Sequence, residues 1–231
     1  MDTKALVVLS GGQDSTTCLF WAMNSFGKEN VQAVLFDYGQ RHAYEMDCAK
    51  RIADMAGVPL HVLPINTFAA IGGTALTDPA MAPQAAGSTP AGQLPSTFVP
   101  GRNLIFMTFA ASLAYKLGIG NLVTGVCETD FSGYPDCRDD TMDALRDAIS
   151  LGMDRDMVIW TPLMEMTKAE EVQMAQELPG CMDALAYSHT CYNGHFPPCG
   201  ECDSCKLRAK GFAEAGVEDP IITRAREEGL L

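Results

Sequence analysis

Leu9-Ser10-Gly11-Gly12-Gln13-Asp14-Ser15-Thr16-Thr17 places a tight bend between an apolar run and a helical pattern. Two glycines let the backbone turn sharply and let a ligand approach main-chain N–H groups. The helix that begins here directs its free N–H groups and the positive end of its dipole at the same point, and the hydroxyls add donors. The stretch therefore predicts an anion site. The alternative is an ordinary turn whose hydroxyls only cap the helix.

This bend matches neither of the two common phosphate-binding patterns. A Walker loop would end in Gly-Lys-Ser/Thr, and a dinucleotide fingerprint would need a third glycine at fixed spacing. The sequence has neither feature after Gly12. The anion site is therefore of another strand–loop–helix type.

Apolar runs alternate with helical patterns along the chain, which is typical of a parallel sheet covered on both faces. Five short runs rich in Val, Leu or Ile predict buried strands at 4–9, 31–37, 60–65, 121–126 and 157–160. Helices are predicted at 14–26, 42–56, 103–117, 139–151, 167–178 and 203–215. Residues 103–117 are apolar nearly all round, which predicts a buried helix, and Thr167 with Glu170 predicts a capping box. We expect an α/β fold with a five-stranded parallel sheet and helices on both faces.

The composition narrows the class of protein. The chain has 231 residues, 47% of them hydrophobic and 19% charged, which suits one α/β domain with a small appendage. A net charge of −13 argues against a nucleic-acid partner. No apolar run is long enough to cross a bilayer, so no membrane partner is expected. Nine scattered or clustered cysteines do not resemble a secreted disulfide framework, and we expect a cytoplasmic protein with reduced thiols.

One segment breaks the alternation of strands and helices. Residues 72–101 contain five prolines and five glycines, so they cannot form one regular element. Two interpretations stay open: a tolerated surface insertion, or a lid or subunit contact beside the site. The second interpretation is compatible with a homodimer.

A four-cysteine cluster lies near the C-terminus with the spacing C-x7-C-x2-C-x2-C. Four thiolates with pairs two residues apart suit tetrahedral Zn²⁺, and a shell filled by protein predicts one structural ion per chain. A [4Fe–4S] cluster and four metal-free thiols are the alternatives. The predicted ligands are Cys191, Cys199, Cys202 and Cys205.

The loop after the fourth predicted strand mixes aromatic, acidic and basic side chains. Ligands of open parallel sheets bind at the carboxyl ends of strands, where this loop begins. Aromatic rings could stack on a purine-like ring, a carboxylate could accept from a guanine edge, and an arginine could meet a substrate carboxylate. A solvated acidic loop is the alternative. The candidate substrate-binding residues are Glu128, Asp130, Phe131, Tyr134, Asp136 and Arg138.

The Ser-Gly-Gly-Gln-Asp-Ser sequence at 10–15 resembles the SGGxDS loop of the ATP pyrophosphatases, or PP-loop ATPases. The resemblance implies an adenine nucleotide alpha hydrolase-like fold, ATP as co-substrate, and Mg²⁺ near Asp14. It implies catalytic roles for Asp14, Ser15 and Lys168, and Arg102 is a further cation candidate. The implied nucleotide-binding residues are Leu9, Ser10, Gly11, Gly12, Gln13, Asp14, Ser15, Thr16, Thr17, Cys18, Leu19, Phe36, Asp37 and Gly125.

Several motifs together narrow this resemblance. The stretches 10–17, 36–42, 98–103 and 124–138 and the four-cysteine tail resemble the family of 7-cyano-7-deazaguanine synthases. The resemblance implies a ligase of queuosine-precursor biosynthesis that converts 7-carboxy-7-deazaguanine and ammonia to the nitrile with ATP. We expect a PP-loop domain at 1–180 that contains the 72–101 insertion, and a zinc-binding region at 181–231 that packs on this domain.

Two other functions stay open. A PP-loop enzyme could adenylate another nucleobase or a tRNA for amidation or thiolation, although the acidic charge argues against tRNA. A non-catalytic zinc module on a nucleotide-sensing fold is the third interpretation, and the intact SGGxDS loop argues against it.

Overall fold

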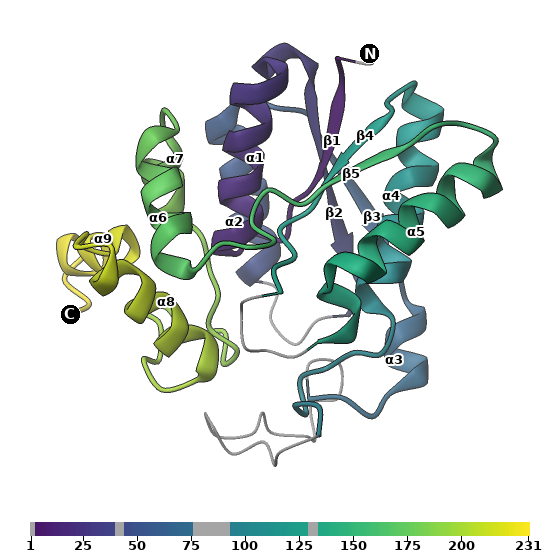
Figure 1. Cartoon of the computed structure of the whole chain (residues 1–231). Coiled ribbons are helices and arrows are strands. Elements are labelled where there is room, and N and C mark those ends of the chain that lie inside the picture. Colours follow the sequence, from purple (N-terminus) through teal and green to yellow (C-terminus); the bar gives the residue numbers. More distant parts are fainter. Residues whose placement is uncertain (1–2, 40–43, 76–92, 129–133) are drawn as a thin grey trace.

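The computed structural model describes residues 3–39, 44–75, 93–128 and 134–231 of the chain (Figure 1). The predicted five-stranded sheet is present, with the strand order β3-β2-β1-β4-β5 and every pair parallel. The strands are β1 Ala5–Val8, β2 Val31–Asp37, β3 Leu60–Pro64, β4 Asn121–Val123 and β5 Val158–Trp160. Strand order reverses at β1, between β2 and β4, so β1 ends at the switch point where such sheets bind ligands.

Helices cover both faces of this sheet, as predicted. They are α1 Gln13–Phe26, α2 Tyr44–Ala56, α3 Thr67–Ile71, α4 Arg102–Leu117, α5 Asp139–Met153, α6 Lys168–Glu177, α7 Cys181–Leu185, α8 Asp203–Glu214 and α9 Pro220–Glu227, with short 3-10 turns η1 Lys28–Asn30 and η2 Pro135–Cys137. Alternate residues of β1 enter two separate cores. Ala5 and Val7 join the core beneath α1 and α2, while Leu6 joins the core beneath α4 and α5.

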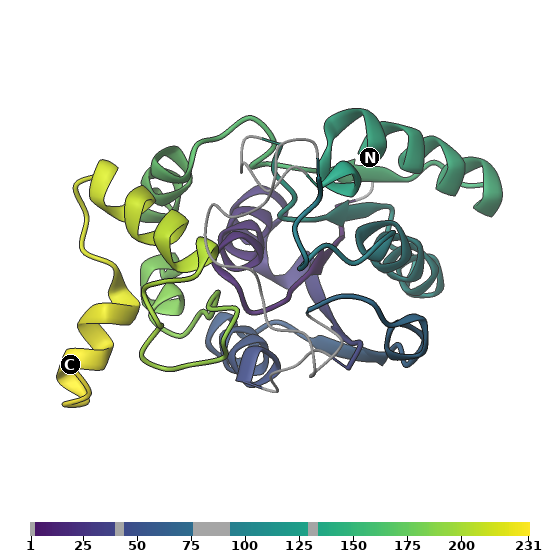
Figure 2. The ribbon, with the colours of Figure 1, turned by 90° about the horizontal axis from the view of Figure 1, so that it is seen from below.

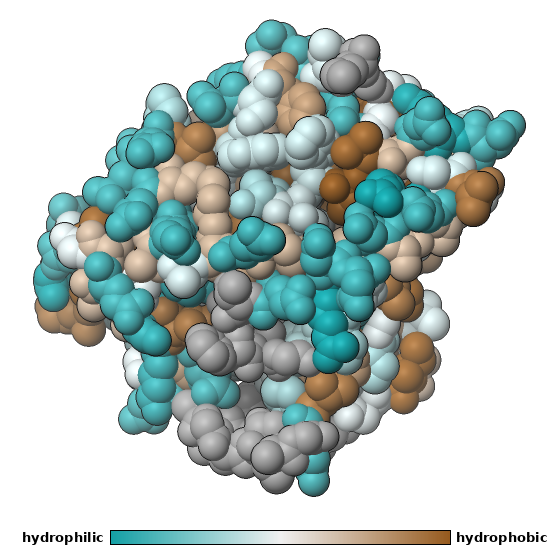
Figure 3. Space-filling view, viewed as in Figure 1, coloured by the Kyte–Doolittle hydropathy of each residue, from teal (hydrophilic) through white to brown (hydrophobic). Residues whose placement is uncertain are grey.

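Two expectations about burial are wrong. The edge strands β3 and β5 are only partly buried, with Val62 47% and Trp160 39% exposed, because each has a neighbour on one side only. Helix α4 is not buried all round. It buries Met107 and three alanines against the sheet and leaves Phe109 and Tyr115 about half exposed, because the described structure covers only its inner side. Figure 3 shows a mainly hydrophilic face with small hydrophobic patches.

The C-terminal helices lie on the opposite side of the sheet from α5 (Figures 1 and 2). Helix α7 packs against α1, and α8 packs along α6. This arrangement brings the segment between α7 and α8 to the carboxyl end of β1, where the His189 N–H donates to the Gly11 oxygen. Within the described residues, no helix has the length and apolar character needed to span a membrane.

The predicted capping box at the start of α6 is confirmed, and it provides a first test. Thr167 Oγ1 accepts from the Glu170 N–H, and the Glu170 carboxylate accepts from the Thr167 N–H at 2.8 Å. We expect Thr167→Ala to lower the free energy of unfolding by about 1 kcal/mol, measured by urea denaturation. Thr108→Ala is the control, because Thr108 is an exposed threonine inside α4 with no capping role. Equal stability losses in the two variants would contradict this account.

Candidate active site

The bend after β1 has the geometry that its two glycines predict. Gly11 has φ +93°, and a Cβ atom there would lie 2.4 Å from the Glu45 carbonyl oxygen of α2. The first hydrogen bond within α1 runs from Thr16 N–H to the Gly12 oxygen at 3.1 Å, so the amides before it have no partner within the helix. Gly12 caps the helix without a side chain. The backbone therefore presents free donors at a helix N-terminus, which suits an anion.

The hydroxyls of this segment divide into two groups. Ser10 and Ser15 bond to each other, with 3.0 Å between their Oγ atoms, and Ser15 Oγ also accepts from the Ser10 N–H. Thr16 Oγ1 donates to the Gly12 oxygen just before α1, the Thr17 hydroxyl lies 3.2 Å from the Gln13 oxygen, and both threonines are fully buried. The serine pair therefore shapes the bend, while the threonines secure the first turns of the helix.

Three members of the implied nucleotide-binding stretch have side chains in the core. Leu9, Cys18 and Leu19 have no exposed surface, and the Cys18 thiol donates to the Thr124 oxygen. Cys18 and Leu19 lie in the second turn of α1, where backbone N–H groups are paired within the helix. Their side chains pack α1 on the sheet, and their contact with a nucleotide stays a prediction.

An ion-pair network stands beside the bend. Lys168, the first residue of α6, places its Nζ 2.7 Å from Asp14 Oδ1 and 3.0 Å from Glu171 Oε2. The other Glu171 oxygen accepts from the Thr17 hydroxyl at 3.3 Å. The structure thus brings together Asp14 and Lys168, which lie 154 positions apart in the sequence.

Two segments that are distant in the sequence contact the bend. One follows β4, and the other lies between α7 and α8. A Cβ atom at Gly125, after β4, would lie 2.9 Å from the Asp14 carbonyl carbon, so only glycine fits against the start of α1. On the other side, the His189 N–H donates to the Gly11 oxygen at 2.8 Å. Gly125 and His189 therefore hold the bend between them.

Arg102, the first residue of α4, lies in an aromatic and acidic environment at the same edge of the sheet. It donates a hydrogen bond to the Tyr38 hydroxyl, and Tyr134 and Asp136 lie nearby. Burial alone would lower the pKa of the guanidinium, but these three residues raise it above its usual value. Arg102 is therefore a permanent cation in this cluster.

The end of β2 supplies the two residues implied near the adenine. Phe36 is buried and stacks on Phe106 of α4, with 4.5 Å between ring centroids. The Asp37 carbonyl accepts from the Ile65 N–H, and its carboxylate accepts from the Gly39 N–H. The Phe36 ring is thus part of the core, and backbone and Asp37 atoms remain for contact with a ligand.

Glu45 of α2 connects the bend with the Arg102 cluster. Its carbonyl faces Gly11, and its carboxyl group lies near Tyr38 and Arg102. Burial raises the pKa of this carboxyl from 4.5 to about 7, and Arg102 opposes the shift. Strongly shifted pKa values are enriched in active sites, although structural ion-pair networks produce them too.

The loop after β4 holds the candidate substrate-binding residues, of which Asp130 and Phe131 lie outside the described residues. Tyr134 is half-buried, and 2.6 Å separates its hydroxyl from Thr97 Oγ1. Asp136 is 5% exposed and accepts from the Asn103 N–H at the start of α4. Its carboxylate thus binds a helix terminus and lies next to Arg102.

The two remaining members of this set, Glu128 and Arg138, are exposed. The Glu128 carboxylate accepts from the Asp139 N–H at the start of α5 at 3.3 Å. Thr97 and Phe98, at the described end of the 72–101 segment, contact Tyr134. The C-terminal end of the 72–101 segment therefore packs against the loop that follows β4.

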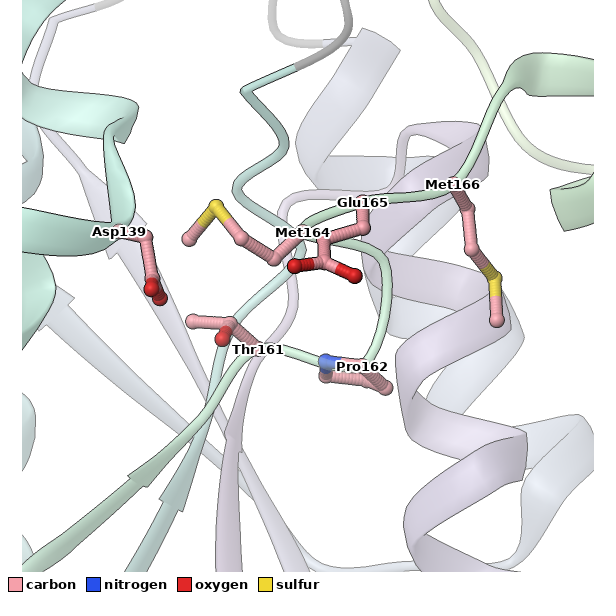
Figure 4. A pocket seen from close by; sticks show the side chains of 6 residues that line it. All are labelled: Asp139, Thr161, Pro162, Met164, Glu165 and Met166. Atoms are coloured by element: carbon pink, nitrogen blue, oxygen red, sulfur yellow. The ribbon is translucent and has the colours of Figure 1, made fainter.

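A pocket of about 300 Å³ opens near the carboxyl end of β5 (Figure 4). Glu128 adjoins it, because its N–H bonds to the Met164 oxygen. Two carboxylates line the pocket, which makes it a poor place for a polyphosphate. The lining residues are Asp139, Thr161, Pro162, Met164, Glu165 and Met166.

The four predicted metal ligands come together in the structure. The Sγ atoms of Cys191, Cys199, Cys202 and Cys205 all lie within 4.8 Å of one another, and those of Cys199 and Cys205 are 3.9 Å apart. Four thiolates at about 2.3 Å from a tetrahedral Zn²⁺ would be about 3.8 Å apart, so the donor set and its spacing fit this ion. The cluster could therefore bind a metal ion.

Sequence reasoning missed Glu45, Glu171 and Gly211. Glu171 follows Lys168 at i+3 in the first turn of a predicted helix, a spacing that puts the two side chains on one face and could have identified Glu171. Gly211 lies inside α8, where glycine is unfavourable unless another segment approaches closely. No local signal marks Glu45, whose environment depends on Arg102 of a distant helix.

These features together define a nucleotide-binding α/β protein of the PP-loop class, with a four-cysteine cluster near its C-terminus. The model of the family "Queuosine biosynthesis protein QueC" matches residues 4–216. The chain therefore belongs to the QueC family.

Curated relatives support the same assignment over nearly the whole chain. The 7-cyano-7-deazaguanine synthase of Chromobacterium violaceum is 62% identical over 98% of this chain and 96% of its own length. The protein of the same name from Laribacter hongkongensis is 58% identical over 95% and 94%. That from Bacillus subtilis is 48% identical over 91% and 94%.

Proposed function

We propose that this protein is an ATP-dependent ligase that converts 7-carboxy-7-deazaguanine and ammonia to 7-cyano-7-deazaguanine. The observation that carries the proposal is the glycine bend with Asp14 and Lys168 beside it, within the range that matches the QueC family. The family places the protein in queuosine biosynthesis, and its curated members carry the name of this synthase.

The bend binds the pyrophosphate end of ATP in this proposal. Free amides at the start of α1 and the Ser10 and Ser15 hydroxyls face the phosphates, and Lys168 supplies positive charge. Arg102 serves as a second cation at the carboxyl edge. Asp14, whose side chain is 30% exposed, would hold Mg²⁺, which neutralises phosphate charge when bound.

The reaction requires two activations by ATP. A carboxylate is a poor electrophile, and transfer of AMP to its oxygen, with release of pyrophosphate, creates a good leaving group. Ammonia then displaces AMP to form the amide. A second AMP transfer to the amide oxygen, followed by loss of AMP and protons, leaves the nitrile. One site serves both steps because both bring an oxygen to the α-phosphorus, and the protein's part is to position the groups and stabilise charge.

The loop after β4 binds the deazaguanine in this proposal. Tyr134 and Phe131 would stack on the ring, and Arg138 would meet the substrate carboxylate. Among the acidic residues, Glu128 and Asp130 are preferred for the guanine edge, because Asp136 already binds the Asn103 N–H.

The four-cysteine cluster holds one structural Zn²⁺ in this proposal, with all four positions filled by protein. The remaining partners are small molecules, and the acidic surface disfavours nucleic acid. We further propose a cytoplasmic location and a homodimer, the latter using the 72–101 segment.

A product assay tests the reaction. The protein mixed with ATP, Mg²⁺, ammonia and 7-carboxy-7-deazaguanine is expected to yield the nitrile, detected by mass spectrometry, with two AMP and two pyrophosphate molecules per nitrile. Omission of ammonia is the control and should stop nitrile formation. ADP as the nucleotide product, or AMP transfer to tRNA instead of the deazaguanine, would contradict the proposal.

A further inference from the structure

We propose that Glu171 is a positioning residue that holds the Lys168 ammonium at the phosphate-binding bend, an inference that rests on the proposed role of Lys168. The ammonium has two carboxylate partners with very different environments. The Asp14 side chain is 30% exposed, and that of Glu171 is 2% exposed. A ligand can therefore reach the Asp14 carboxylate, whereas the Glu171 carboxylate is buried on the protein side of the ammonium.

Glu171 is itself held in place from α1. Its second oxygen accepts from the hydroxyl of Thr17, which is fully buried. A buried carboxylate is costly unless it is paired and hydrogen-bonded, so its presence here requires the Lys168 ammonium and the Thr17 hydroxyl together. Burial, with a contribution from Glu171, raises the pKa of the Cys18 and Cys181 thiols, so no neighbouring thiolate competes for the ammonium.

The backbone of Lys168 is fixed as firmly as its ammonium. A Cβ atom at Gly211 of α8 would lie 2.6 Å from the Lys168 Cβ and 3.1 Å from its carbonyl carbon. Helix α8 therefore packs directly on the first turn of α6, and the stem of the lysine cannot shift toward it. Backbone packing and the Glu171 carboxylate together restrict a side chain that is otherwise flexible.

The two carboxylates have different tasks when the nucleotide binds. In the proposed function Asp14 would hold Mg²⁺, and its carboxylate would then be less available to Lys168. Glu171 is shielded from solvent and from the ligand, so it keeps the ammonium charged and directed at the bend. Less side-chain freedom is then lost on binding, which improves affinity.

The test measures binding of α,β-methylene-ATP, which cannot be cleaved between the α and β phosphates, by calorimetry. Glu171→Gln keeps the shape and the Thr17 hydrogen bond but removes the charge, and we expect binding about 10-fold weaker, the size of a typical coupling between contacting groups. Glu170→Gln is the matched control. It weakens the capping box of the same helix, so it is expected to lower the melting temperature without changing nucleotide affinity.

A double-mutant cycle then separates this inference from the proposed function. Glu171→Gln is expected to have no further effect in a Lys168→Ala background. An equal loss in both backgrounds, or unchanged binding by Glu171→Gln where Lys168→Ala weakens it, would overturn the inference alone. Unchanged binding by Lys168→Ala would overturn the proposed role of Lys168 and the inference with it. If Glu171→Gln does not fold, Glu171→Asp keeps the charge and should retain most of the affinity, and a 10-fold loss there would count against the inference.

Discussion

An Asp14→Ala variant is expected to release pyrophosphate at less than about one hundredth of the wild-type rate, the usual scale for removing one group that stabilises charge in a transition state. Asp14 is the acidic residue of the bend that is both exposed to a ligand and paired with the Lys168 ammonium. Without it, the proposed Mg²⁺ loses its protein ligand, while Lys168 keeps Glu171 as its partner. The fold should persist, because the Asp14 side chain is not part of either core.

The measurement is pyrophosphate release with saturating ATP and 7-carboxy-7-deazaguanine, together with circular dichroism of both proteins. Asp143→Ala is the control, because Asp143 also pairs with a cation, Arg146, but on the exposed surface of α5. Its rate is expected to match the wild type. An Asp14→Ala rate close to that of the control would refute the assignment of the bend.

A Cys202→Ser variant is expected to lose its metal and to melt about 10 °C lower, because loss of a structural ion removes roughly 3 kcal/mol or more of stability. Cys202 directly precedes α8, so its loss frees the start of the helix that supports Lys168. Metal content per chain and the melting temperature are measured together. The wild type is expected to hold one zinc ion.

Cys127→Ser is the control for this experiment, since Cys127 is buried to a similar degree but lies outside the cluster. It is expected to retain the zinc. Unchanged metal content in Cys202→Ser would remove the metal site from the proposal. Iron and sulfide in the wild type, in place of zinc, would show a [4Fe–4S] cluster.

The sequence predicted the parts of the molecule that depend on local chemistry. The glycine bend, the capping box at Thr167 and the spacing of the cysteines are each written in a few adjacent residues, and the structure contains all three. The five strands were also found, with ends within three residues of the observed bounds. These features need no knowledge of which segments meet in space.

The rest of the site depends on segments that meet only in the folded chain. The raised pKa of Glu45 comes from burial and is opposed by Arg102, and both effects depend on segments that only the folded chain brings together. The order of the strands in the sheet also cannot be read from the sequence of each strand. Edge strands and central strands were therefore both predicted to be buried. The apolar pattern of α4 likewise predicted complete burial, although the described residues cover only one side of that helix.

The contacts of His189 with Gly11 and of Gly211 with Lys168 have a consequence for biosynthesis of the protein. The glycine bend is among the first stretches to leave the ribosome, yet His189 and Gly211 belong to the last fifth of the polypeptide. A nascent chain that ends after α6 would contain the glycine bend but would lack the contacts of His189 and Gly211. The proposed nucleotide binding is therefore expected to appear late in synthesis, after α8 has emerged and packed on α6, and not when the sheet first forms.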